Sequence, residues 1–308
     1  MMGDNLLNWK NLQNPVYKRW RWSIKDPCMA ERDSEFYIFF SAFYRDLVKT
    51  KSHVIGISTK DWKTFNDPLL YLDGKEQGWG GMCSPNLTEF GDQYYLSFNS
   101  WGDMHPNGQK NQLFYITSKD LKNWSDPKPC AKNLTQNKRA IDLALYKHND
   151  KWIGIWKEQG VVKAAWADDI DGNFHNIGDD GNVTLYQENL FQKKKGFENF
   201  QIILIDGEFY LLAVGYPPTD PFIFKMKGTG DKLEDWTYWK DPNKICVKTE
   251  DFNKDQYAQS PFLSDWREKN GNFYLLYAGR NEGFTHAGRG NYKLALAKSK
   301  DLKSWFVP

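Results

Sequence analysis

A five-fold internal repeat is the feature that most constrains this chain of 308 residues. In each copy a turn that contains Gly, Asp or Asn leads into an aromatic-rich segment with strand character. Equivalent places in the five copies are marked by Tyr37, Tyr95, Trp152, Tyr210 and Tyr274, which are 58, 57, 58 and 64 residues apart. A period of this size indicates repeated units that bury their faces against their neighbours.

Further strands and turns complete each unit. Partner strands are predicted at His53–Ser58, Gln112–Thr117 and Tyr292–Ala297, each followed by a Lys-Asp turn and a Trp. A unit of about 60 residues with about four short strands is typical of a propeller blade. We therefore predict an all-β, five-bladed β-propeller that forms a single catalytic domain over residues 1–308. A β-sandwich or a pair of domains is the alternative, but neither explains a five-fold period.

The N-terminal stretch resembles the end of the first unit. Asn8–Pro15 and Asp61–Pro68 share the same separation of six residues between a Trp and a Pro. The last unit ends at Pro308 without an outer strand of its own. We therefore predict that the N-terminal stretch supplies the outer strand of the last blade.

Charge and composition exclude several classes of partner. The 41 basic and 39 acidic side chains leave a net charge of only +2, which gives no support to a nucleic-acid partner. No apolar run approaches the roughly 18 residues of a membrane span. The four cysteines stand far apart, without zinc-like spacing. No secretory signal is visible at the start, so we expect a cytoplasmic protein with reduced thiols, or a secreted one if a signal was trimmed. The oligomeric state is left open.

Carboxylates recur where each blade should line the central channel. The segments some 10 to 15 residues before the repeat marks begin with Asp26, Ser84, Asp142, Glu198 and Ser260. We interpret these five positions as equivalent, and three of the five residues carry carboxylates. Crowded carboxylates repel one another and raise each other's pKa, so Asp26, Asp142 and Glu198 are the predicted catalytic residues. The alternatives are a turn residue before Pro27 for Asp26 and structural ion pairs with Arg139 and Lys195 for the other two.

Aromatic and polar side chains should surround these carboxylates. In an antiparallel blade the end of the second strand lies beside the start of the first. The aromatic content of 16% suits the flat faces of sugar rings. A carbohydrate substrate is predicted, and its candidate binding residues are Phe43, Ser84, Trp101, Trp156, Tyr216 and Arg280. A generic polar rim is the alternative. Long connections at 102–111 and 282–291 favour a narrow pocket and action on chain ends.

The motifs Ile24-Lys25-Asp26-Pro27, Ile141-Asp142 and Phe197-Glu198, on this five-fold repeat, resemble those of glycoside hydrolase family 43. The resemblance extends over about residues 8 to 308. It implies a five-bladed propeller that cleaves glycosidic bonds with inversion, mostly in α-L-arabinofuranosides and β-D-xylosides. By the same resemblance Asp26 would be the general base, Glu198 the general acid, and Asp142 the residue that orients this acid.

The resemblance also implies roles near the last blade. Arg280 would bond the sugar beside the cleavage point. Many relatives carry a channel histidine there, sometimes with calcium beneath the sugar, whereas this chain has Gln259 at that place and His286 in a later loop. We therefore expect no cofactor and treat a channel calcium as the less favoured alternative.

Three rival functions stay open from the sequence. One is a sugar-binding propeller without turnover, although no catalytic carboxylate is missing. A second is a retaining fructosidase with Asp26 as nucleophile, which typically begins with Asn-Asp-Pro rather than Lys25-Asp26-Pro27. The third is a glycoside phosphorylase, which would need a basic cluster for phosphate. Its candidates Arg45, Lys157 and Arg280 are scattered along the chain.

Overall fold

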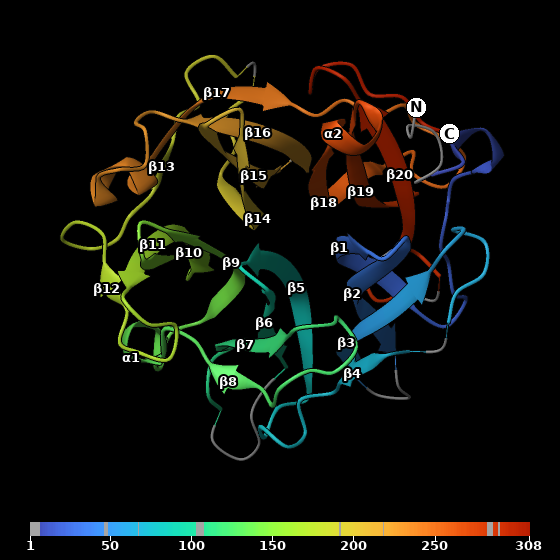
Figure 1. The fold of residues 1–308 in the computed structure, drawn as a ribbon. Coiled ribbons are helices and arrows are strands. Elements are labelled where there is room, and N and C mark those ends of the chain that lie inside the picture. The colour runs from blue at the N-terminus through green and yellow to red at the C-terminus, as the bar shows by residue number, and fades with distance from the viewer. Residues whose placement is uncertain are drawn as a thin grey trace.

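Five small sheets surround a common axis in the computed structural model, and the two chain ends lie near each other (Figure 1). The structure describes residues 7–45, 49–66, 68–102, 108–190, 192–217, 219–281, 286–288 and 290–308. The five repeat marks each lie in the second strand of a sheet. The predicted five-bladed β-propeller is therefore confirmed.

The first three blades have four strands each, in sequential order. Blade 1 contains β1 (Ser23–Arg32), β2 (Glu35–Arg45), β3 (Thr50–Thr59) and β4 (Leu70–Leu72). Blade 2 contains β5 (Gly81–Phe90), β6 (Gln93–Trp101), β7 (Leu113–Ser118) and β8 (Lys128–Pro129). Blade 3 contains β9 (Ala140–His148), β10 (Lys151–Glu158), β11 (Val161–Ala167) and β12 (His175–Asn176).

The last two blades depart from this pattern. Blade 4 contains β14 (Gly196–Ile205), β15 (Glu208–Tyr216), β16 (Asp220–Met226) and β17 (Tyr238–Lys244), and β13 (Thr184–Leu185) pairs in parallel with β17. Blade 5 contains β18 (Gln256–Trp266), β19 (Asn272–Arg280) and β20 (Lys293–Ser299). Short helices are η1 (Trp9–Asn11), α1 (Lys132–Thr135), η2 (Leu233–Thr237) and α2 (Arg267–Asn270). None of the helices in the described ranges is long and apolar enough to span a bilayer.

The hydrophobic core lies between adjacent blades. The second strands are apolar on both faces: in β2, Phe36, Ile38 and Phe40 are buried on one face, and Tyr37 and Phe39 are buried on the other. A strand buried on both faces has no need of an alternating pattern, because each face of its blade packs on a neighbouring blade. Of the four free cysteines, Cys28, Cys83 and Cys130 are buried, and Cys246 is exposed.

The Lys-Asp turns are built alike in three blades. The carboxylates of Asp61, Asp120 and Asp301 each accept hydrogen bonds from the backbone N–H groups two and three residues later. This is the local bonding that favours Asp in turns. The repeated sequence therefore reflects a repeated turn between the third strand and the outer edge of a blade.

The N-terminal segment lies against the outer edge of blade 5, but it supplies an isolated β-bridge rather than the predicted outer strand. Tyr17 exchanges two backbone hydrogen bonds with Leu294 of β20, of 3.3 and 2.9 Å. The side chain of Asn14 donates to the carbonyl of Leu296 at 3.0 Å and accepts from its N–H at 2.9 Å. The pairing residue lies two positions beyond the predicted stretch, which itself carries η1. The ring is thus closed by the Tyr17–Leu294 bridge and the Asn14 side chain, which join the two ends of the chain.

Loss of the Asn14 side chain should weaken this closure. Asn14→Ala removes both bonds and leaves the buried N–H and carbonyl of Leu296 without these partners, so we expect a loss of about 1–3 kcal/mol in the free energy of unfolding. Urea denaturation of the variant measures this value. Asn11→Ala, at an exposed position in η1, is the matched control and should change stability by less than about 0.5 kcal/mol. If the two variants lose the same free energy of unfolding, the Asn14 side chain does not stabilise the contact between the N-terminal segment and blade 5.

Candidate active site

The five innermost strands share one backbone distortion. Asp26, Ser84, Asp142, Asn199 and Ser260 have φ values of 53, 55, 60, 53 and 48°. Each lies where the pairing between the first and second strands shifts register. Such bulges re-aim side chains and are frequent beside active sites, and Asp and Asn tolerate a positive φ better than most residues. The repeat therefore places five polar side chains around the axis.

Register corrects one part of the sequence interpretation. Glu198 pairs with Val214 at the place where Lys25 pairs with Ser41, whereas Asn199 occupies the bulged position of Asp26. The five equivalent positions therefore hold two carboxylates, not three. Glu198 belongs to the preceding ring of residues, whose other members are Lys25, Cys83, Ile141 and Gln259. Its negative charge still acts on Asp142 and raises the pKa of that carboxyl.

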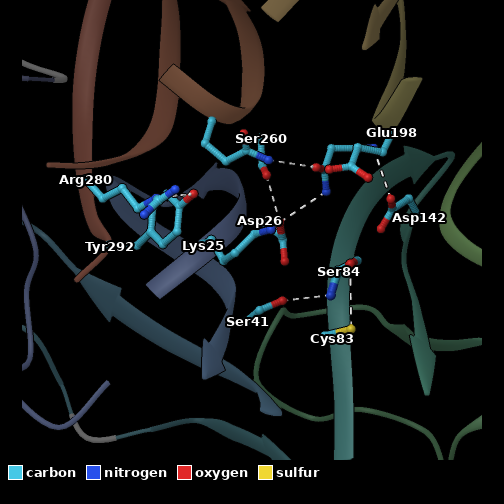
Figure 2. Close-up of polar contacts among 12 residues, drawn as sticks. Lys25, Asp26, Ser41, Cys83, Ser84, Asp142, Glu198, Ser260, Arg280 and Tyr292 are labelled. Carbon is cyan, nitrogen blue, oxygen red and sulfur yellow. Dashed lines mark hydrogen bonds and ion pairs between the residues drawn. The ribbon is translucent and has the colours of Figure 1, made fainter. Parts of the chain in front are cut away.

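Asp26 is held by one of its two oxygens. Its Oδ1 accepts hydrogen bonds from Ser260 Oγ at 2.7 Å and from Asn199 Nδ2 at 3.1 Å. The ammonium of Lys25 lies 3.4 Å from the same oxygen. Figure 2 shows Lys25 and Asp26 of β1 meeting Ser260 of β18. Every contact found among the described residues falls on Oδ1, so Oδ2 is available to bind a water molecule.

Asp142 is a buried carboxyl. Burial, followed by the negative charges of Glu198 and Asp26, raises its pKa from 3.8 to about 6, against a hydrogen bond from Ser84. The backbone N–H of Asn199 donates to its Oδ2 at 3.2 Å (Figure 2). Its own N–H donates to Asn99 Oδ1 at 3.0 Å. Ser84, predicted to bind substrate, thus lies beside this carboxyl and contacts it.

The raised pKa of Asp142 makes a prediction about stability. The folded state binds the proton of Asp142 more tightly than the unfolded chain does. Ionisation of Asp142 therefore lowers the free energy of unfolding as pH rises from about 4 to above 6. Asp142→Asn removes that cost. The stability of the variant relative to wild type should therefore rise by about 3 kcal/mol between about pH 4 and pH 7.5. Urea denaturation at both pH values tests it, and the exposed control Asp168→Asn should show no such rise.

Glu198 forms an ion pair that the sequence analysis did not assign. Lys157 Nζ lies 3.0 Å from its Oε2, and the Lys157 side chain is only 8% exposed. The same ammonium lies 4.9 Å from the ring centre of Tyr216. Lys157 attracts the negative charge of Glu198 and Asp142 repels it, so the two neighbours act on this carboxyl in opposite directions. The predicted partner Lys195 is not among the ion pairs of Glu198 found in the described residues.

A second group of cations lies on the other side of Asp26 (Figure 2). Burial disfavours the ammonium of Lys25, but Asp26 and the other funnel carboxylates outweigh it and raise the pKa of Lys25. Arg280 donates through Nε to the Tyr292 hydroxyl at 3.0 Å and lies 3.3 Å from Asp255. Lys25 Nζ lies 5.9 Å from the ring centre of Tyr292. Arg280 is therefore near the carboxylates, linked to them through Tyr292 and Lys25.

The predicted aromatic rim is formed only in part. Trp101 and Tyr216 are partly exposed or exposed, and Trp101 packs on Phe43 with ring centres 5.0 Å apart. Phe43 is only 3% exposed and therefore supports the wall more than it offers a face. Trp156 is 1% exposed and packs in the core beside blade 2, so the expectation that its ring faces the funnel is wrong. Its neighbour Lys157 faces the carboxylates instead.

Two further features bear on ligands. Half of the residues in the two long connections predicted to narrow the funnel, 102–111 and 282–291, lie outside the described residues, namely 103–107, 282–285 and 289. Across the described ranges, no group of three or more His, Cys, Asp or Glu is placed to hold a metal ion. At the position of the expected channel histidine, Gln259 donates to Asn199 at 3.3 Å, and an ammonium already lies against Asp26. This set does not fit a calcium site, and we derive no step through a metal.

Comparison with known proteins supports the fold. No protein-family model matches the chain, and no curated protein matches it. A glycosyl hydrolase from Bacteroides ovatus has a TM-score of 0.64 and 16% identity, over 98% of this chain and 94% of that one. An exo-1,5-α-L-arabinanase from a bovine ruminal metagenomic library has a TM-score of 0.60 and 15% identity, over 97% and 100% of the two chains.

A third structure is the Bacteroides ovatus protein named Xyloglucan PUL GH43B. It has a TM-score of 0.63 and 16% identity, over 96% of this chain and 56% of that one. The resemblance to family 43 is therefore supported at the level of the fold. The chain has the same five-bladed architecture as these solved glycosidase structures.

Proposed function

We propose that the protein hydrolyses glycosidic bonds, with inversion, in α-L-arabinofuranosides or β-D-xylosides. The observation that carries the proposal is the convergence of Asp26, Asp142 and Glu198 from three blades on one funnel. Glycoside hydrolysis requires two carboxyl groups of different protonation on either side of the bond. The arabinanase and the xyloglucan-locus protein with this fold support the choice of substrates.

The roles follow from the contacts of each carboxyl. Asp26, held through Oδ1, would take a proton from water at Oδ2 while the water oxygen attacks the anomeric carbon. Glu198 would give its proton to the departing oxygen as the glycosidic bond breaks. Asp142, whose pKa is raised in part by the charge of Glu198, would orient this acid. The products are an inverted sugar hemiacetal and an alcohol.

The cations that the sequence offered for phosphate do not gather at one place. Lys157 pairs with Glu198, Arg280 contacts Asp255 and Tyr292, and Arg45 lines a separate cavity on blade 1. Lys25 and Arg280 do lie on the same Tyr292 ring beside Asp26, so the phosphate dependence of turnover decides between hydrolysis and phosphorolysis. A binding propeller without turnover is disfavoured because the funnel retains all three predicted catalytic carboxylates.

A panel of aryl glycosides tests the proposal. The purified protein is assayed on α-L-arabinofuranosides, β-D-xylosides, fructosides and mannosides, with and without phosphate, and the first-formed anomer is identified by NMR. We expect turnover of one of the first two classes, no phosphate dependence, and inversion. Retention would indicate a fructosidase-like mechanism, and phosphate dependence a phosphorylase. Sugar binding without turnover of any substrate would favour the binding propeller.

A further inference from the structure

A second cavity, of about 620 Å³, lies outside the funnel on blade 1 and the N-terminal segment. We call it the blade 1 groove and define it by Trp20, Trp22, Tyr44, His53 and Tyr71, with the arginines Arg21 and Arg45. Its volume lies in the range of roughly 300–1,000 Å³ that is usual for small-ligand sites. None of its residues belongs to the three-carboxylate site.

The floor of the groove is an ordered row of rings. Tyr44 of β2, His53 of β3 and Tyr71 of β4 follow one another across three strands, with ring centres 5.0 and 4.7 Å apart. The Tyr44 hydroxyl lies 3.0 Å from His53 Nε2. Burial lowers the pKa of His53 to about 4, so the ring is neutral at neutral pH and the row carries no charge there. The floor is therefore formed before any ligand arrives.

The walls expose aromatic surface beside hydrogen-bond donors. Within the described part of the chain, Trp20, Phe306 and Tyr71 are the large hydrophobic side chains that are more than half exposed, at 64, 60 and 54%. Two of these three lie in the groove. The guanidinium of Arg21 lies 4.8 Å from the ring centre of Trp20. Exposed aromatic surface gathered in one cavity marks a binding site more often than single exposed residues do.

This combination fits a carbohydrate better than an apolar ligand. A pyranose or furanose ring has C–H groups that pack on an aromatic face and hydroxyl groups at its edge. Trp20 and Tyr71 supply faces, and Arg21, Arg45 and the tyrosine hydroxyls supply donors and acceptors. An apolar ligand would remove water from the Arg21 and Arg45 guanidinium groups without offering them hydrogen bonds.

The position of the groove also links it to the funnel. Trp22 precedes β1, which carries Asp26, and Arg45 ends β2, so the groove opens at the end of the propeller that holds the carboxylates. Phe43 and Tyr44 are consecutive on β2, and Phe43 packs in the funnel wall with Trp101. The N–H of Gly290 donates to the carbonyl of Trp22 at 3.1 Å, which ties the groove wall to the connection that carries His286.

We propose that the blade 1 groove binds a segment of a polysaccharide chain outside the funnel. The choice of carbohydrate as occupant rests on the proposed function, because the funnel would act on the same class of molecule. The groove would raise the affinity for long chains by holding a second segment near the carboxylates.

Binding rather than turnover tests the groove. Asp26→Asn serves as the background, and its migration is measured in native gels that contain soluble arabinan, arabinoxylan or xyloglucan. At least one of these polysaccharides should retard it. Adding Trp20→Ala with Tyr71→Ala should raise the dissociation constant about tenfold or more, because aromatic anchors dominate binding sites of this kind.

Phe306→Ala is the matched control, since Phe306 is similarly exposed but does not line the groove and instead bridges to Lys298 of β20. It should leave the retardation unchanged, and all variants should unfold at the same temperature. Three results would overturn the proposal that the groove binds polysaccharide. The first is retardation that persists in the double variant, the second is an equal loss of retardation in the control, and the third is no retardation by any of the polysaccharides. If the double substitution abolishes retardation but the wild-type protein turns over no glycoside, the proposed hydrolase function is overturned and the proposed polysaccharide binding by the groove is supported.

Discussion

Asp26→Asn is expected to lower kcat/KM for an aryl glycoside by at least about 100-fold. The amide cannot take the proton from the attacking water, and general base catalysis of this kind contributes about 10²–10⁴-fold. The amide has nearly the size of the carboxylate, so Ser260 and Asn199 keep a neighbour at the position of Oδ1. Steady-state kinetics on the aryl substrate found in the panel measure the effect.

A companion variant separates base from acid. Glu198→Gln should reduce turnover of an aryl glycoside less than turnover of an oligosaccharide, because a good leaving group needs little protonation. Asp168→Asn is the control, since this carboxylate is 79% exposed and pairs with Lys151 on the surface of blade 3. It should retain full activity. Activity of Asp26→Asn within about threefold of wild type would place the base elsewhere.

Asp220→Ala is expected to lower the free energy of unfolding by about 3–5 kcal/mol, the largest stability effect that we predict. Asp220 pairs with Lys194, whose side chain is only 1% exposed, and with Lys244 at 2.7 Å. It also accepts a hydrogen bond from Tyr257 at 3.2 Å, which joins blade 4 to blade 5. Removal of the carboxylate leaves the buried ammonium of Lys194 without its counter-charge, and such losses cost this much.

Urea denaturation at neutral pH measures this loss, and pH gives a second test. Burial disfavours the ionised form of Asp220, but Lys194 and Lys244 outweigh burial and lower the pKa of this carboxyl. Ionised Asp220 therefore stabilises the fold above about pH 4, and this stabilisation is lost as pH falls further. Asp168→Ala, which breaks an exposed ion pair, should cost less than about 1 kcal/mol. If Asp220→Ala loses no more free energy of unfolding than this control, the ion pair between Asp220 and Lys194 does not stabilise the fold.

Most of the architecture was predictable from periodicity. The spacing of Tyr37, Tyr95, Trp152, Tyr210 and Tyr274 requires five like units, and each of these residues lies in a second strand. These units are local and repeated, so the same short-range physics produces each copy. The likeness of Asn8–Pro15 to Asp61–Pro68 predicted an N-terminal outer strand on blade 5, but that stretch carries η1 and the contact with blade 5 is a bridge made by Tyr17. The catalytic roles of the carboxylates stay a prediction, although their convergence is described.

The errors arose where a bulge changes the direction of side chains. Glu198 was counted in the ring of Asp26, but the register shift after Glu198 gives that place to Asn199. Trp156 was expected in the funnel, but it lies opposite the shift between Ile155 and Lys157 and packs in the core. Side chains alternate along a regular strand, and an extra residue in a bulge reverses the alternation. A sequence pattern does not reveal on which side of the shift a residue falls.

The sequence by itself determined the number of blades and the equivalent inner positions of Asp26 and Asp142, because a repeat of nearly constant length places equivalent residues alike. Only the tertiary structure decided which cations accompany the acids. Lys25 lies against Asp26, and Lys157, from blade 3, pairs with Glu198 of blade 4. It also brought Trp20, Tyr44 and Tyr71 together in the blade 1 groove. Such contacts join residues of different strands and blades, and their geometry depends on how the blades pack rather than on any local pattern.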